Sequence, residues 1–546
     1  MRPKSVINRP GTVRYAVANI PYAIDKRLKS DSFAPILYTL PENTWEEEPI
    51  GIPPHNKADA VLNYSLLARM EESMMDTSDV RVLTAGETPP NDSVVPPRVP
   101  RFTDTVAYIA DPDQFCRTNL SRYGPVFQTN VFGNTTVFVG SARAVQMTFN
   151  GDNHYSEIGL PPTTMEMFGE HSLFQRPDLH RQRKSALSPG FAGAMLAGYM
   201  PRIHHVIDQH LQQWHPGKPL FLFPAVEQVS FDVLAPLLLG IELNAGNDLP
   251  ADKSLQGLPI SSKAKLKQLY KTFFDGFYGL SKWRSPFTVF GRGLRARAQL
   301  LDFMRAVIRQ RRAQGNHETK TPTDFLEMML VSQHQNPDSV FTDTLIENQC
   351  LLQLWASHYE VSGLAASWMY QVSHDDAVIE RLWAEQTTVI NHTQSLDTVT
   401  MDDLKQMPYL DATIKETLRT LPPSSTATRR LTQSVVLDGV LYKKGWNLIA
   451  EPRIAHAMEA HFTEPDRFYP DRFLPAHNEG RMYEFIPFGG GVHACLGAQM
   501  ATTIMKVLAI HLLPRFRWQR LGKAAFVQFP LKRIKDNYQI QLRTRS

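Results

Sequence analysis

The sequence predicts a mainly α-helical protein with small β-sheets, that is, an α+β fold. Three observations support this class. Runs of β-type residues lie near residues 124–139 and 437–448, a long stretch of helical periodicity separates them, and 42% of the 546 residues are hydrophobic against 21% charged. Strands gathered at both ends of a helical region are typical of α+β proteins. The composition is that of a folded globular chain and excludes a disordered protein, collagen and a disulfide scaffold.

The first 96 residues differ in composition from the rest of the chain. Thirteen of the 39 prolines lie within the first 100 residues, including the pairs Pro53-Pro54, Pro89-Pro90 and Pro96-Pro97. Proline removes a backbone donor and blocks helix continuation, so we expect extended or loosely packed chain here, interrupted by one helix near residues 58–72. We interpret residues 1–96 as a proline-rich N-terminal extension and residues 97–546 as the main domain.

The main domain begins with a predicted hairpin and continues into helices. Two β-runs within residues 124–139 are separated by Gly133-Asn134, a common hairpin turn. Helical periodicity then dominates residues 179–407 and predicts long helices around 200–215, 293–314, 343–373 and 375–389. Residues 437–448 return to strand-forming residues around a glycine turn.

The most informative local pattern is a glycine-rich loop that ends in a lone cysteine. Residues 488–497 read Phe-Gly-Gly-Gly-Val-His-Ala-Cys-Leu-Gly, and apolar residues then recur with helical spacing. Cys495 therefore lies near a predicted helix N-terminus, where backbone N–H groups stabilise a thiolate. Such a thiolate suits axial ligation of haem iron. The alternative is an unreactive buried cysteine beside a turn.

This loop resembles the haem-binding signature of the cytochrome P450 superfamily, and two further motifs follow the family's order and spacing. The three motifs are Phe488-x-x-Gly491-x-x-x-Cys495-x-Gly497, Glu416-x-x-Arg419 followed by Pro422-Pro423, and Pro470-Asp471-Arg472-Phe473. The resemblance extends from about residue 97 to the C-terminus. It implies a P450 fold, a single large haem domain over residues 97–546, and haem b (iron protoporphyrin IX) as the cofactor.

The resemblance assigns roles around the haem. It implies that Cys495 is the proximal thiolate, that Phe488 packs near its sulfur, and that Gly491 and Gly497 admit close approach of the backbone. Cations are expected at the haem propionates, since ionised donors bind carboxylates well; the residues at the family's positions are His493, Arg429, His180 and Lys184. For residues 181–184 an alternative stays open, namely a solvated basic face that receives an acidic redox partner.

Glu416, Arg419 and Arg472 are expected to form a structural ion network in the core. Burying such charges singly costs several kcal/mol, so they must pair with one another. Their implied role is to fix the geometry of the haem loop, not to take part in catalysis.

The helix expected over the haem departs from the family pattern. Where P450s usually carry Ala-Gly-x-(Asp/Glu)-Thr, this chain reads Ala-Ser-His-Tyr-Glu at residues 356–360. Tyr359 then stands at the acid position and Glu360 at the alcohol position of a pair that helps deliver protons during dioxygen cleavage. A carboxylate facing haem is costly unless it is protonated, hydrogen-bonded or wet. We therefore expect Glu360 either to have a raised pKa or to face a water channel.

Several functions are consistent with this helix. In the first function, a rearranged proton relay is formed by His358, Glu360 and Ser362, and a bulged turn shifts Glu360 by one position. In the second, the enzyme uses peroxide or rearranges a pre-oxidised substrate. In the third, it couples or dehydrogenates aromatic substrates, and Glu360 binds or deprotonates an N–H or O–H. A packing role for Glu360 and a non-catalytic haem sensor are the remaining alternatives. We favour dioxygen-dependent oxidation, either hydroxylation or oxidative coupling as in secondary metabolism.

The sequence also predicts partners and location. Aromatic residues between positions 270 and 290 lie where the family has its access loop, opposite a second wall at residues 155–175, and an apolar or aromatic small molecule is the expected substrate. Electrons are expected from a separate ferredoxin/reductase or flavoprotein. A net charge of +4 argues against nucleic acid. No run reaches the ~18 apolar residues of a membrane span, although peripheral contact through the aromatic patch stays open, and we expect a cytoplasmic protein.

Overall fold

The computed structural model describes residues 80–99, 104–152, 154–174, 177–241, 257–260, 262–279, 282–314, 321–336, 338–390 and 395–545. The helix predicted near residues 58–72 and most of the predicted N-terminal extension lie outside these ranges. Within them, the predicted mainly α architecture with small sheets is confirmed.

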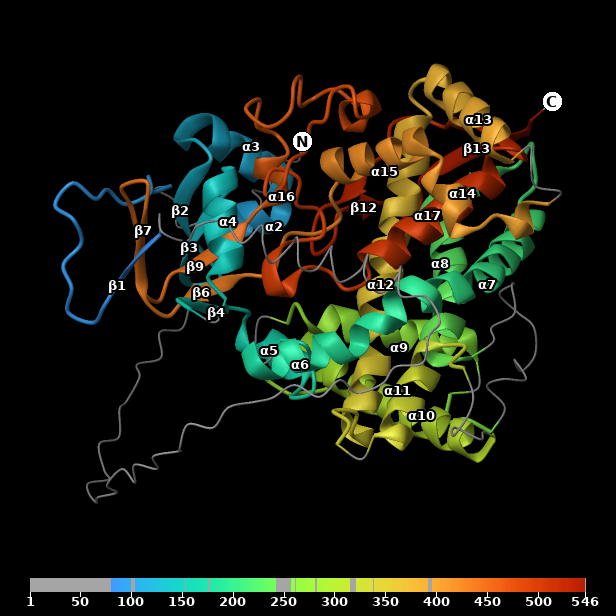
Figure 1. The fold of residues 1–546 in the computed structure, drawn as a ribbon, viewed down its shortest axis with the longest axis horizontal. Helices are drawn as coiled ribbons and strands as arrows, with labels where there is room; N and C mark the ends of the chain where they lie inside the picture. Colours follow the sequence, from blue (N-terminus) through green and yellow to red (C-terminus); the bar gives the residue numbers. More distant parts are fainter. Residues whose placement is uncertain are drawn as a thin grey trace, which may run out of the picture. The chain divides into compact units, whose positions relative to one another are not determined.

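Helices account for most of the described chain, and α12 runs through the middle of them (Figure 1). The α-helices are α2 (Asp104–Ala110), α3 (Pro112–Tyr123), α4 (Ala142–Asn150), α5 (Pro162–Phe168), α6 (Pro177–Leu187), α7 (Gly193–Gln212), α8 (Leu222–Leu239), α9 (Lys263–Gly276), α10 (Val289–Gln314), α11 (Phe325–Gln335), α12 (Asp343–Val372), α13 (Asp376–Ile390), α14 (Met401–Lys405), α15 (Pro408–Thr420), α16 (Pro452–Ala455) and α17 (Ala498–Leu512).

Four small sheets accompany these helices. Their strand orders are β2-β3-β9-β6-β4, β1-β7-β8, β10-β13-β5 and β11-β12, and among the strand pairs of the described residues only β3–β9 is parallel. The strands are β1 (Arg81–Leu83), β2 (Val126–Val131), β3 (Asn134–Val139), β4 (Ser156–Ile158), β5 (Pro219–Phe221), β6 (Arg429–Leu431), β7 (Ser434–Leu437), β8 (Val440–Tyr442), β9 (Asn447–Ala450), β10 (Phe516–Arg520), β11 (Phe526–Val527), β12 (Arg533–Ile534) and β13 (Gln539–Thr544).

The hairpin of β2 and β3 turns one residue earlier than predicted. Phe132 and Gly133 form the two-residue turn, with φ angles of 53° and 78°, and Asn134 already pairs with Val131. Two successive left-handed residues make the turn that matches strand twist. Phe132 supplies the first of them in place of the usual asparagine or glycine.

Helix α12 is continuous from Asp343 to Val372 and begins at an N-cap, where the Thr342 hydroxyl accepts from the backbone N–H of Leu345. All thirty residues are α-helical. The bulged turn proposed for this helix is therefore wrong, because the α-helical backbone continues unbroken through Glu360. The helix packs against α8, α10, α15 and α17, which makes it the central support of the molecule.

Part of the proline-rich segment is built into a sheet. Strand β1 pairs antiparallel with β7, Arg81 lying opposite Val436, and the backbone N–H of Val94 donates to Gly439 O at 2.9 Å. Residues 81–83 and Val94 thus extend the β7–β8 hairpin, and the chain between them contains turns at residues 85–86 and 91–92.

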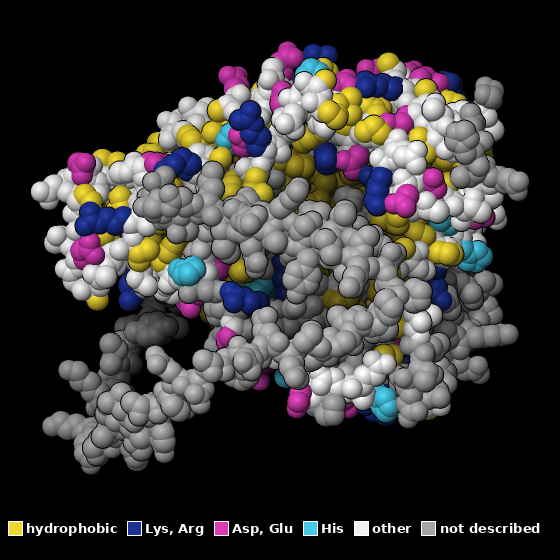
Figure 2. Space-filling model, viewed as in Figure 1, with side chains coloured by type: hydrophobic (Ala, Val, Ile, Leu, Met, Phe, Trp, Pro, Cys, Tyr) yellow, Lys and Arg dark blue, Asp and Glu magenta, His cyan; other side chains and the backbone are white. Residues whose placement is uncertain are grey.

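The main core lies among the helices, and a smaller core lies between α4 and the five-stranded sheet. Acidic and basic side chains are interspersed over the coloured surface in Figure 2. One described helix, α8, is long and apolar enough to span a membrane by composition, yet most of it is buried inside the protein, as in a core helix.

Candidate functional site

Cys495 lies in a tight loop at the start of α17. Its backbone N–H donates to Phe488 O at 2.8 Å, which closes the loop. It is exposed, whereas Cys116 and Cys350 are buried. Desolvation raises the pKa of the Cys495 thiol, and the N–H groups of Gly497 and Ala498 act in the opposite direction. The helix terminus therefore opposes the rise caused by burial, and thiolate ligation by Cys495 stays a prediction.

The glycines before Cys495 are required by a neighbouring helix. Gly491 has φ +64°, and a Cβ there would lie 2.5 Å from Phe149 O. A Cβ on Gly490 would lie 2.3 Å from the Phe149 ring. The loop can therefore lie against α4 only with glycine at these positions. Gly497, by contrast, has ordinary space around it.

Two residues of α6 hold the cysteine loop by its backbone. Lys184 Nζ donates to Val492 O at 2.8 Å and to Ala494 O at 2.7 Å. The His180 ring lies between Leu173 O and Val492 O, at 2.5 and 2.8 Å. Both predicted propionate contacts thus lie beside the loop and position it. Burial lowers the pKa of Lys184 to about 8, and the thiol charge opposes that shift.

The basic face proposed for residues 181–184 is largely absent. Lys184 holds the loop, and Arg183 is buried and donates to Glu170 O and Ser172 O. Of the three cations, only Arg181 is exposed.

Arg429 is fully buried and paired with an acid that sequence reasoning missed. Its Nε donates to the two carboxylate oxygens of Asp152 at 2.7 and 2.9 Å, and its Nη1 donates to Ala427 O. Burial raises the pKa of Asp152 to about 6 despite the guanidinium. His493 lies next to this pair, with Nε2 4.0 Å from Asp152 Oδ2. Its Nδ1 is buried and has no hydrogen-bond partner among the described residues.

These side chains fit a haem bearing two carboxylates. The exposed thiol of Cys495 lies at a helix N-terminus. The loop is surrounded by two cations, Arg429 and Lys184, and by the unpartnered Nδ1 of His493, whereas the site has one buried acid, Asp152. Positively charged donors in excess over acids are the chemistry that propionates need.

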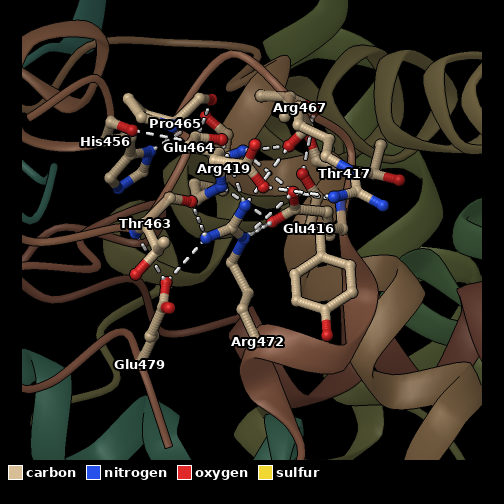
Figure 3. Close-up of polar contacts among 12 residues, drawn as sticks. Glu416, Thr417, Arg419, His456, Thr463, Glu464, Pro465, Arg467, Arg472 and Glu479 are labelled. Carbon is tan, nitrogen blue, oxygen red and sulfur yellow. Dashed lines mark hydrogen bonds and ion pairs between the residues drawn. The ribbon is translucent and has the colours of Figure 1, made fainter. Parts of the chain in front are cut away.

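The predicted ion network forms, and both of its arginines contact Glu416 (Figure 3). Arg419 donates from Nε and Nη2 to the two oxygens of Glu416 at 2.7 and 2.8 Å, and Arg472 Nε donates to Oε1 at 3.2 Å. All three side chains are buried. Arg472 also donates to Glu479 at 2.6 Å, which supplies the network's second acid.

His456 connects this network to the cysteine loop. Arg419 Nη1 donates to His456 O, and the His456 ring contacts Arg419 O through Nδ1. The ring's Nε2 accepts from the backbone N–H of Ile486 at 3.0 Å, two residues before Phe488. Since Nε2 accepts, Nδ1 carries the proton. The network therefore reaches the loop through one neutral imidazole.

Glu360 lies in the middle of α12, and its carboxyl is buried. Its Oε2 is buried without a hydrogen-bond partner among the described residues. Burial raises the pKa of Glu360 to about 8. Burial is the main cause that raises the pKa of the Cys495 thiol and of the Tyr278 phenol, and the charge of Glu360 adds to both shifts. Ala356, one helical turn earlier, is exposed on the same face.

The structure does not bring His358, Tyr359 and Ser362 to Glu360. His358 Nδ1 contacts Leu354 O at 3.0 Å, and its ring packs edge-on against those of Phe231 and Tyr270. Ser362 donates to His358 O, and Tyr359 packs against Phe274. Burial lowers the pKa of His358 to about 4, which keeps it neutral. A relay through these residues is not assembled.

The aromatic residues near position 280 divide into two groups. Tyr270, Phe273, Phe277 and Phe290 are buried, and the Phe277 ring stacks on Trp355 of α12 with centroids 4.2 Å apart. Trp283 and Phe287 are 69% and 88% exposed. The first group forms a wall beside α12, and the second lies on the surface.

Comparisons with known proteins agree with this geometry. The family model "Cytochrome P450" matches residues 95–538. A cytochrome P450 120 from Synechocystis is 28% identical over 83% of this chain and 97% of its own length. An abscisic acid 8'-hydroxylase 2 from Arabidopsis thaliana is 26% identical over 77% and 83%. The solved structure of a retinoic acid-bound cyanobacterial CYP120A1 superposes with TM-score 0.72 at 27% identity, covering 83% of this chain and all of its own.

Proposed function

Since this chain belongs to the cytochrome P450 family, we propose that it hydroxylates an apolar small molecule with dioxygen, and that Glu360 replaces the family's acid–alcohol pair. The buried, unpartnered carboxyl of Glu360, whose charge acts on the Cys495 thiol, is the observation that supports this function most.

The residues of the cysteine loop and those of α12 have different roles. Haem bound through Cys495 would supply dioxygen activation and oxygen insertion. Lys184 and His180 hold the loop that carries the thiolate. At neutral pH, Glu360 with a pKa near 8 is mostly protonated. Because Oε2 bonds to nothing else described, Glu360 can donate its proton toward the thiolate side of α12.

The substrate and the donor are part of the same proposal. The aromatic wall of Phe277 and Trp355 favours an apolar body. Two relatives are named for apolar isoprenoid acids, one as bound to retinoic acid and one as an abscisic acid hydroxylase. We place electron supply with a separate ferredoxin or flavoprotein and the enzyme in the cytoplasm. Oxidative coupling and a role in secondary metabolism are not favoured by any contact described above.

Product analysis tests the proposal. The purified protein is incubated with retinoic and abscisic acids, once with reductase, NAD(P)H and dioxygen, and once with peroxide alone. We expect a product heavier by one oxygen atom only in the first reaction, with the label of 18O2. Product in the peroxide reaction alone would instead support the peroxide-dependent alternative. A thiolate-type carbon monoxide spectrum with no product from either would favour the sensor.

A further inference from the structure

A groove with a volume of about 610 Å3 lies between α5, α10 and α12. Its lining is partly apolar, with Met165 and Leu301, and partly charged. Arg297 of α10 and Asn348 of α12 lie side by side in it, since Arg297 Nη2 donates to Asn348 Oδ1 at 2.7 Å.

Arg297 has no acidic partner among the described residues. Its Nε donates to Met167 O at 3.0 Å, and its Nη2 donates to the Asn348 amide, so both identified acceptors are neutral. Burial lowers the pKa of this guanidinium, the Arg305 charge adds to that effect, and no acid opposes it. A half-buried cation without a counter-ion favours an anionic ligand.

The other charges of the groove are mostly neutralised within the protein. Glu347 pairs with Arg305 at 2.9 Å, and Glu166 pairs with Arg284 at 2.5 Å. Glu170 is exposed at the edge of the groove. Among the described residues, Arg297 is therefore the groove cation that lacks an acidic partner, and the exposed Glu170 is the groove acid that is not paired with a cation.

The groove and Glu360 are separated by a distance that suits an elongated molecule. Asn348 precedes Glu360 by twelve residues on one continuous helix, which corresponds to ~18 Å along the axis and about 120° round it, so a molecule joining them would have to curve round α12. Between them lie the rings of Phe168 and Trp355, edge-on at 5.3 Å, and of Phe277. An apolar body of that length would contact aromatic side chains along its course.

We propose that the substrate is an elongated apolar carboxylic acid and that Arg297 binds its carboxylate, which leaves the far end of the molecule near Glu360. This inference rests on the proposed function. Gly169 is part of the arrangement: its φ is +77°, and a Cβ there would lie 2.3 Å from Arg297 Nη2. Any other residue would displace the guanidinium from its present position.

Arg297 also has a structural role that the test must separate. It contacts a carbonyl at the C-terminal end of α5, and Asn348 Nδ2 contacts the next one, Phe168 O, at 3.2 Å. Loosening α5 would weaken binding of acids and esters alike. Loss of a carboxylate contact would weaken binding of acids only.

The experiment is an optical titration of the haem-loaded protein with retinoic acid, its methyl ester, dodecanoic acid and its methyl ester. We expect each acid to bind at least about 10-fold more tightly than its ester. Arg297→Gln should remove this preference and leave ester affinity unchanged, and Arg297→Lys should retain part of it. Arg295→Gln removes the same charge from an exposed position on the same helix and should change nothing.

Three outcomes would overturn the inference: equal affinity for acid and ester in the wild type, an unchanged preference in Arg297→Gln, or no binding of any probe by protein with a thiolate-type carbon monoxide spectrum. An equal loss of acid and ester affinity in Arg297→Gln would mean that Arg297 acts only by holding α5 in place. Absence of the thiolate spectrum would instead contradict the proposed function itself.

Discussion

His456 Nε2 accepts a hydrogen bond from the backbone N–H of Ile486 at 3.0 Å, and both residues are buried. This contact is the route by which the Glu416 network reaches the cysteine loop. His456 belongs to none of the three motifs that the sequence identifies, so motif matching alone does not find this contact.

We predict that His456→Phe lowers the free energy of unfolding by about 1–3 kcal/mol, because the buried Ile486 N–H and Arg419 O each lose a partner. Denaturant titration measures the loss. The carbon monoxide spectrum should also show a larger fraction of protein without thiolate ligation. His477→Phe, at an exposed position, is the control. Equal spectra for the two variants would argue against the link to the loop.

Arg472→Ala should be far more damaging than loss of a surface ion pair. It leaves Glu416 and Glu479 with one cation fewer in the core, and breaking such a buried pair costs about 3–5 kcal/mol. We expect little soluble haem-loaded protein, measured as the ratio of Soret to protein absorbance. Lys405→Gln breaks the exposed pair with Asp402 and should cost less than about 1 kcal/mol. Normal haem content in Arg472→Ala would refute the structural role.

Protonation of a buried histidine pair should destabilise the protein in acid. Arg515 Nη1 donates to His511 Nδ1, so His511 Nε2 donates to His204 Nδ1 at 2.8 Å, and His204 Nε2 donates to Val399 O. Burial lowers the pKa of His511 from 6.5 to about 3. The unfolded chain therefore takes up a proton that the folded protein does not, and stability falls as pH drops from 6.5 toward 3.

The expected slope from His511 is about 1.4 kcal/mol per pH unit within that window. Denaturant titrations between pH 7 and 4 measure it. His511→Leu should lower this slope by about 1.4 kcal/mol per pH unit, the contribution of one proton, whatever the stability of the variant at pH 7. His215→Leu, which changes an exposed histidine, is the control. An unchanged slope in His511→Leu would contradict the neutral pair. His204, Asp397 and His511 lie close enough together to hold a metal ion. Because the Arg515 guanidinium donates to His511, its positive charge opposes cation binding, and added Zn2+ should not raise Tm.

The sequence was sufficient where chemistry depends on local pattern. Strand-forming runs, helical periodicity and the Cys495 loop are all local, and the structure has them at the expected places. It was insufficient where helix geometry decides. His358 and Ser362 share one face of α12, whereas Glu360 lies about 200° round the helix from His358. Although the three residues are close in sequence, Glu360 therefore points away from the other two.

Long-range pairs were equally inaccessible. Asp152 and Arg429 are 277 positions apart, and nothing in the residues around Asp152 marks it as the partner of a buried arginine. Whether an acid lies beside Arg297 likewise depends on how α5, α10 and α12 pack together. Only the folded chain shows which charges are neutralised.

Proton donation by Glu360 is the central claim, and the pH dependence of product formation in the wild type and in Glu360→Gln tests it most directly. With reductase, dioxygen and the substrate found by product analysis, the wild-type rate should fall as pH rises through about 8, where the carboxyl loses its proton. Glu360→Gln should be slower on the order of 100-fold and lack that inflection, with electrons diverted to peroxide. A variant with wild-type rate and the same pH profile would contradict the account.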